Sequence, residues 1–114
     1  MRYCETHTLA IAEGDALSGI LDVRRVSEVW LLMPAEWTAA SLGIKTSPTL
    51  AGTFVPLCDT AGDRVVFTVQ VDGVQVAPVS LAGAGFIKLW SNTAGVDEAQ
   101  VAARSFTVIL RAEV

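Results

Sequence analysis

The sequence has few of the residues from which catalytic and metal centres are built. Its 114 residues include one histidine and two cysteines, and charged residues make up only 18%. It contains no nucleophile elbow, no phosphate-binding loop and no zinc-ligand spacing. His7 has only Glu5 beside it on a strand-like segment, whereas general acid–base catalysis needs an oriented partner within hydrogen-bond distance. We therefore expect no enzymatic activity, no catalytic residue, no metal and no cofactor, and we expect His7 on the surface.

Long apolar segments and targeting signals are also missing. The longest uninterrupted apolar run, Val29 to Met33, is far too short to cross a bilayer, so no membrane partner is expected. The segment from Met1 to His7 lacks the apolar core of a secretion signal. We expect a chain that is made and folded in a cytoplasm, where Cys4 and Cys58 are more often buried thiols than a disulfide. The net charge of −4, with basic residues scattered singly, argues against nucleic acid as a partner.

Apolar residues, in contrast, are abundant. They make up 52% of the chain, which has the length of one domain spanning residues 1–114. A domain of this size has a high ratio of surface to volume and cannot hide so much apolar surface by itself. We therefore expect part of that surface to be covered by a partner, which could be a second copy of the chain.

Short runs rich in Val, Phe, Trp, Ile and Thr alternate with Gly, Pro, Asp and Asn, which is typical of strands separated by turns. Helix is expected only as single turns at residues 34–37 and 96–102. The pattern predicts a single antiparallel β-sandwich of about eight strands, of a jelly-roll or galactose-binding-like kind. The expected strands are residues 27–33, 40–47, 53–57, 64–71, 74–79, 86–91 and 104–111, with weaker candidates at 6–11 and 16–22.

The dipeptide Asp72-Gly73 predicts a two-residue hairpin turn, because both positions of a type I′ turn have positive φ angles. Pairing outward from it places Val71 opposite Val74, Val69 opposite Val76 and Phe67 opposite Pro78 on one face.

The segment from Asp59 to Asp63 allows two interpretations. Two carboxylates across a turn could hold a hard cation such as calcium, which takes six to eight oxygen ligands. Few other ligands are visible, so we favour an ordinary polar turn in which Gly62 supplies the bend.

The tryptophans are the residues for which the sequence supports a binding role and a place in the core most nearly equally. Alternation in 86–91 places Phe86, Lys88 and Trp90 on one face. If the opposite face is core, Trp90 is exposed beside Lys88 and becomes an interface anchor or a sugar platform. If the faces are reversed, Trp90 is core and the Lys88 stem lies over apolar surface. Phe86, Lys88 and Trp90 are the candidate interface residues, whereas Trp37 is expected to plug one end of the sandwich.

Several segments together resemble a family of small virion proteins encoded by tailed phages and prophages. The most specific are Met33-Pro34-Ala35-x-Trp37 and Gln100-x-Ala102-Ala103-Arg104. The others are Leu17-Ser18-Gly19, Ile44-x-Thr46-Ser47, Gly52-Thr53-Phe54-x-Pro56-Leu57 and Phe86-Ile87-Lys88-Leu89-x-Ser91. Members of the family commonly have Asp-Gly after the serine that Ser47 matches, whereas this chain has Pro48-Thr49-Leu50-Ala51, so that turn is built differently.

The resemblance implies a β-sandwich carried on a phage particle, with no catalytic residues. It predicts a capsid cement or decoration protein that binds the major capsid protein, or another virion protein, as a small homo-oligomer in the virion. The alternative is a carbohydrate-binding or adaptor module of a head fibre, tail or baseplate, in which an exposed Trp90 or Trp37 stacks on a sugar.

Overall fold

The chain folds into antiparallel strands. The computed structural model describes residues 2–26, 28–67, 69, 71, 73–76 and 84–113, and within them no residue is helical. No helix in this part of the chain has the length and apolar character needed to cross a bilayer. The ten strands are β1 (Arg2–Ile11), β2 (Leu21–Asp22), β3 (Glu28–Leu32), β4 (Ser41–Ser47), β5 (Val55–Pro56), β6 (Val66–Phe67), β7 (Val74–Val76), β8 (Phe86–Thr93), β9 (Val96–Asp97) and β10 (Arg104–Glu113).

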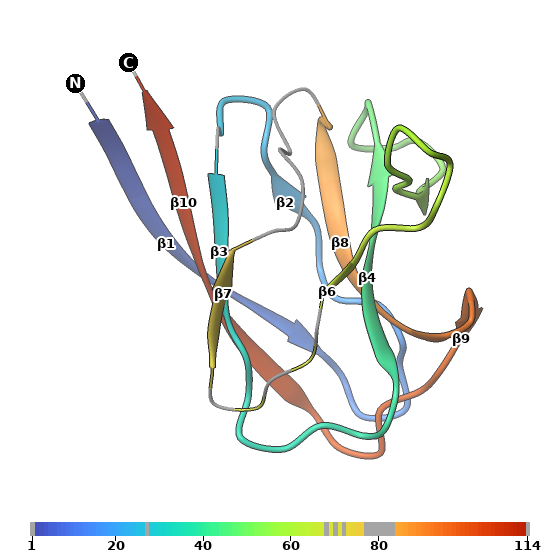
Figure 1. The fold of residues 1–114 in the computed structure, drawn as a ribbon. Coiled ribbons are helices and arrows are strands. Elements are labelled where there is room, and N and C mark those ends of the chain that lie inside the picture. The colour runs from blue at the N-terminus through green and yellow to red at the C-terminus, as the bar shows by residue number, and fades with distance from the viewer. Residues whose placement is uncertain are drawn as a thin grey trace.

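The strands form two sheets that pack face to face (Figure 1). The first has the order β1-β10-β3-β7, and the second has the order β2-β8-β4-β5. β6 pairs with β4 and takes the place of a continuation of β5, whereas β9 is a short addition to β8. With β5 and β6 counted as one interrupted strand, this is the strand order of a jelly roll. The predicted all-β antiparallel sandwich is therefore confirmed.

The core lies between the sheets and follows the alternation of the strands. Phe106, Val108 and Leu110 of β10 face inward, whereas Ser105 and Arg111 face outward and are exposed. The buried hydrophobic cluster consists of Leu9, Ile11, Leu21, Val23, Val26, Val29, Leu31, Met33, Leu42, Ile44, Val65, Phe67, Ile87, Leu89, Phe106, Val108 and Leu110.

Most predicted strands are present, but two predictions differ from the structure. Val66–Phe67 pair with β4 in one sheet and Val74–Val76 pair with β3 in the other, so the ladders of the described residues do not include the predicted pairing of Val71 with Val74. Asp72 and Pro78, on which that hairpin depends, lie outside the described residues. The expected helical turns at 34–37 and 96–102 are both wrong, because no residue of either segment is helical and Val96–Asp97 form β9 against β8.

Candidate functional site

Both faces of β8 are buried, which the sequence interpretation did not foresee. Ile87 and Leu89 lie in the core, yet Phe86 is only 8% exposed and Trp90 only 2% exposed on the opposite face. Neither alternative for Trp90 is therefore right in full: Ile87 and Leu89 are core, and Trp90 is buried as well. An anchor needs exposed area, and Trp90 offers little of it in the isolated chain. The part that Phe86, Lys88 and Trp90 take in an interface stays a prediction.

Cationic side chains cover the aromatic rings on this outward face. Lys45 Nζ lies 4.7 Å from the centre of the Trp90 ring, and Lys88 Nζ lies 4.7 Å from that of Phe54. Lys45 and Lys88 are directly opposite each other in the ladder, where two like charges repel. The aromatic rings, together with Asp97 at 3.9 Å from Lys45 Nζ, offset that repulsion.

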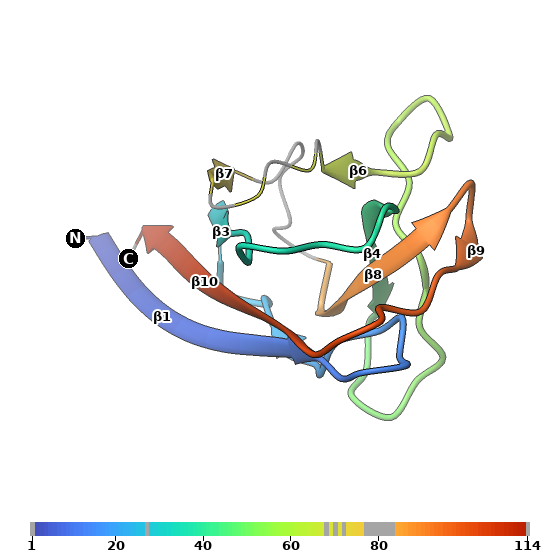
Figure 2. The ribbon, with the colours of Figure 1, turned by 90° about the horizontal axis from the view of Figure 1, so that it is seen from below.

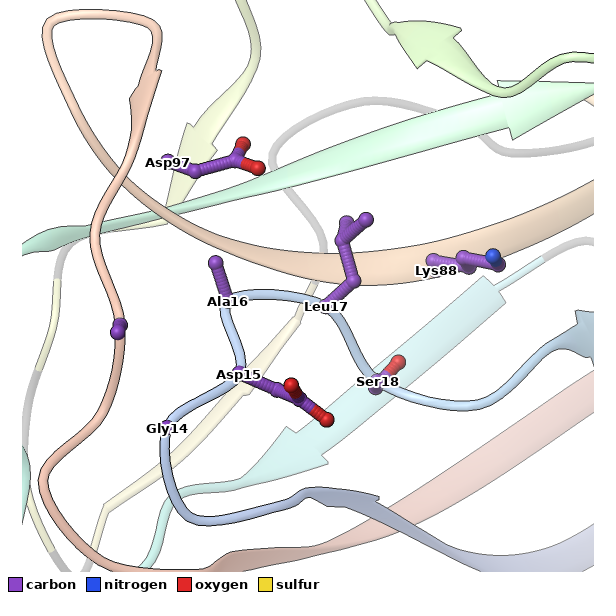
Figure 3. Close-up of a pocket in the computed structure, with 8 residues that line it drawn as sticks. Gly14, Asp15, Ala16, Leu17, Ser18, Lys88 and Asp97 are labelled. Atoms are coloured by element: carbon purple, nitrogen blue, oxygen red, sulfur yellow. The ribbon is translucent and has the colours of Figure 1, made fainter.

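A pocket of about 430 Å³ opens beside β8 (Figure 3). Its wall is the segment 14–18, which runs along β8 because the Ser18 N–H donates to the Leu89 carbonyl at 3.0 Å and the Ser91 N–H donates to the Ala16 carbonyl at 2.8 Å. Figure 3 shows Lys88 and Asp97 toward opposite ends, with Leu17 between them. The lining residues are Gly14, Asp15, Ala16, Leu17, Ser18, Lys88, Asp97 and Ala99.

Two of the three charged side chains that line this pocket, Asp97 and Lys88, already have structural partners. The Trp90 Nε1–H donates to Asp97 Oδ1 at 2.7 Å, and Lys88 lies over the Phe54 ring. The described lining residues include no aromatic ring on which a sugar could stack and no histidine or cysteine. The pocket has the chemistry to admit a small polar molecule and has no pair of nucleophile and base.

The Asp59 to Asp63 segment is a polar turn, as favoured. The Asp59 carboxylate accepts hydrogen bonds from the N–H groups of Ala61 at 2.9 Å and Asp63 at 3.0 Å, and Gly62 has a φ of +84°. Both bonds are to Oδ1 of Asp59, which therefore holds the backbone of the turn. Throughout the described residues, no three His, Cys, Asp or Glu side chains gather as a metal site would require.

The histidine and the cysteines lie at the surface. His7 is in β1, partly exposed, and its Nε2 contacts Glu5 Oε1 of the same strand. Cys4 and Cys58 are both free and exposed in the structure, so the expectation that these thiols are buried is wrong. Cys4 is exposed because it lies on the outward face of β1.

The two most specific segments of the resemblance contact each other at Glu36 Oε2 and Arg104 Nη1, which are 3.8 Å apart, and the second segment also contacts Thr38, the residue that follows Trp37. Gln100 is fully buried, and its Oε1 accepts hydrogen bonds from the Thr38 N–H and from Arg104 Nε, each at 3.0 Å. Arg104 Nη2 also donates to Thr38 Oγ1 at 3.2 Å. Trp37, beside Thr38, is partly buried against the core with its ring 5.7 Å from that of Phe106, as predicted. These residues join two loops and do not form an open site.

An apolar surface that the sequence interpretation did not single out lies on the outward face of the first sheet. Trp30 is opposite Ile109 in the ladder, and Leu32 is opposite Val74. Trp30, Leu32 and Ile109 are each partly exposed, and Val74 is 56% exposed. We call these four residues the Trp30 face. Its signal in the sequence is Trp30-Leu31-Leu32, where every position is apolar although only alternate ones can reach the core.

Polar groups border the Trp30 face. Trp30 Nε1–H donates to Glu28 Oε2 at 3.0 Å, and the Arg111 guanidinium lies 5.6 Å from the centre of the Trp30 ring. A tryptophan surrounded by apolar residues, with arginine and glutamate at the margin, is the composition of a protein-binding surface.

Comparisons with known proteins give one clear likeness of fold. No protein-family model matches the sequence, and no curated protein matches it. The crystal structure of the SPBc2 prophage-derived protein YomS is similar with a TM-score of 0.65 and 11% identity, over 98% of this chain and 96% of that one. A chain of the Bacillus endospore appendages, described as a family of disulfide-linked pili, matches with a TM-score of 0.46 and 11% identity, over 100% of this chain and 88% of that one. This chain and YomS therefore share a fold, whereas the second TM-score is too low to define a common fold.

Proposed function

We propose that this protein is a structural component of a phage particle, a cement or decoration protein that binds the head surface as a small homo-oligomer. The observation that carries the proposal is the Trp30 face, an apolar surface on the outside of a sandwich whose core is already complete. The fold shared with a prophage-derived protein and the resemblance to phage virion proteins support the setting. The role is non-catalytic and is exerted in the virion.

A cement protein acts by burying surface across the joints between capsomers. Each bound copy stabilises the assembled particle and not the separated subunits, so the free energy needed to separate capsomers rises with occupancy. A stable protein interface buries about 800 Å² on each partner. One outer sheet face with an aromatic centre is suited to such a contact, and the pocket beside β8 is not needed for it.

The test is the addition of purified protein to phage heads that lack it. Bound protein should co-sediment with the heads and raise the temperature at which they release their DNA. Failure to bind heads before or after expansion would contradict the proposal. A glycan array run in parallel separates the alternative, because binding to a sugar without binding to heads would indicate a carbohydrate-binding module of a fibre or tail.

A further inference from the structure

The strand β1 forms an unusually long free edge. It is the outermost strand of its sheet and spans ten residues, the last of which, Ile11, bridges to Ser18 on the side away from β10. The strands at the other sheet edges are short, with three residues in β7 and two each in β2 and β5. A free edge presents unpaired N–H and C=O groups to which another strand can add.

Few of the features that normally keep a long edge strand from pairing with another chain are present in β1. It contains neither proline nor glycine, and its register with β10 runs from Arg2 opposite Glu113 to Ile11 opposite Arg104 without a bulge. The N-terminal end of β1 projects with the end of β10 beyond the other strands (Figure 2). The outward side chains of Thr6 and Thr8 are exposed.

One such feature, a charged side chain on the inward face of the edge strand, is present in β1. Its position allows it to pair with a residue of a second, identical strand. Glu5 and His7 both lie on that face, and they contact each other within one chain. In an antiparallel pair of identical strands centred on Thr6, Glu5 lies opposite the partner's His7 and His7 lies opposite the partner's Glu5. Cross-strand carboxylate–imidazole pairs are favourable, and the symmetry makes two of them.

We propose that two copies of this chain join through their β1 edges, antiparallel, around a twofold axis at Thr6, to form one continuous eight-stranded sheet. This inference rests on the homo-oligomer of the proposed function and names the surface that forms it. Neighbouring registers are less favourable: a shift of the centre to residue 5 brings two glutamates face to face, and a shift to residue 7 brings two histidines together.

A single-cysteine experiment tests the register. In the background Cys4→Ser and Cys58→Ser, the variant Thr6→Cys places a thiol directly opposite its own copy, where paired Cα atoms lie about 4.5–5.5 Å apart. This is within the Cα separation of about 4.4–6.8 Å that a disulfide spans. Thr8→Cys in the same background is the matched control, since its copy is offset by four residues, or about 13 Å.

Under mild oxidation, Thr6→Cys should form covalent dimers at least about tenfold faster than Thr8→Cys, with both melting temperatures near that of the background protein. Equal rates at the two positions would overturn the proposal. So would a protein that sediments as a dimer while neither variant is crosslinked, or one that is monomeric at all concentrations. None of these outcomes bears on binding to phage heads, which is measured separately.

Charge reversal gives a second, non-covalent test. Glu5→Lys places an ammonium opposite the partner's His7 twice in each dimer and should raise the dimer dissociation constant by about tenfold. The double variant Glu5→Lys with His7→Glu places opposite charges at the two facing positions and should return the constant toward that of the wild type. Sedimentation equilibrium measures both, and an unchanged dissociation constant in Glu5→Lys would overturn the register.

Discussion

Trp90 is buried because a glycine stands opposite it in the neighbouring strand. A Cβ at Gly43 would lie 3.2 Å from Cε3 of the Trp90 ring and 3.0 Å from Nδ2 of Asn92. The absence of a side chain at Gly43 therefore lets the indole approach β4 closely, where Lys45 covers it and Asp97 accepts its N–H. The ring belongs to a small second core on the outside of the second sheet.

The variant Trp90→Ala should consequently lose about 3–5 kcal/mol of unfolding free energy. Trp30→Ala is the control, because Trp30 is partly exposed on the Trp30 face and its removal should cost about 1 kcal/mol. Urea denaturation followed by circular dichroism measures both. Equal losses in the two variants would show that the burial of Trp90 does not contribute to stability.

The ion pair of Asp22 and Arg24 allows a prediction of how stability changes at low pH. Side-chain and backbone hydrogen bonds from Arg24 lower the pKa of Asp22 from 3.8 to about 2. A carboxylate whose folded pKa is lowered contributes stability above its unfolded pKa and loses that contribution as the pH falls toward 2. The contribution is small because both groups are exposed.

NMR titration of the Asp22 carboxyl should therefore show a lower midpoint than in Arg24→Ala. That variant removes the side-chain hydrogen bonds but keeps the backbone N–H donor, so its midpoint should rise only part of the way toward that of an ordinary aspartate. Arg25→Ala, which removes only a weaker coulombic effect, should leave most of the shift in place. A midpoint unchanged by Arg24→Ala would contradict the assignment.

At the scale of elements, the buried Gln100 connects the loop after β3 with the loop before β10. Gln100→Ala would remove the acceptor shared by Thr38 and Arg104, and it would leave a 7% exposed arginine without that partner. We expect a loss of about 2–4 kcal/mol. Glu36→Ala, which breaks only the 3.8 Å contact of Arg104 with an 87% exposed side chain, should cost less than about 0.5 kcal/mol. A small loss in Gln100→Ala on thermal or chemical denaturation would contradict the role of this network.

Two glycines with nearly the same φ angle allow the cost of a left-handed backbone conformation to be separated from the cost of a steric clash. Gly62 and Gly85 have φ values of +84° and +85°, but only at Gly85 would a Cβ meet another atom, the Ser47 carbonyl oxygen at 2.7 Å. Gly62→Ala should cost about 1–2 kcal/mol from the left-handed conformation alone. Gly85→Ala should cost about 1–3 kcal/mol more. Similar midpoints of denaturation for the two variants would rule out the close approach at Gly85.

A strand was predictable from the sequence where its own residues alternate between apolar and polar types. Alternation in 104–111 identifies β10 and its inward residues because only one face of that strand is buried. The burial of Trp90 was not predictable, since it depends on Gly43 across the ladder and on the turn that leads to β9. The sequence 64–79 has the local signs of a hairpin, yet β6 and β7 belong to different sheets, which no local signal reports.

At the scale of the whole molecule, the apolar excess of the sequence has a definite location. Some of the apolar residues form the core, and others lie on the outward face of β8, where lysine side chains cover them. A third group forms the Trp30 face and remains exposed. The interface residues suggested by the sequence and the surface favoured by the structure are therefore on opposite sheets. The reason is that the alternation of apolar and polar residues shows which side chains share one face of a strand. It does not show which other residues cover that face.

A matched pair of valines tests which surface binds the phage head. Val74, in the Trp30 face, is 56% exposed, and Val96, in β9, is 70% exposed. Val74→Asp introduces a charge that must lose water in the contact and should weaken head binding by about 2 kcal/mol or more. Val96→Asp should bind as the wild type does, with both variants as stable as the wild type within about 0.5 kcal/mol. Weaker binding by Val96→Asp alone would assign the contact to the second sheet.

The position of β10 has a consequence for how the chain is made. β10 lies between β1 and β3, although it follows both of them in the sequence (Figure 1). The first sheet therefore cannot close until β10 has been synthesised, and at about 5–20 residues per second β1 has no neighbouring strand for on the order of ten seconds. During that interval the strand is without any partner in its own sheet. Folding of this protein should accordingly be completed only after β10 leaves the ribosome, and synthesis at high local concentration should favour premature contacts between the waiting N-terminal strands of neighbouring nascent chains.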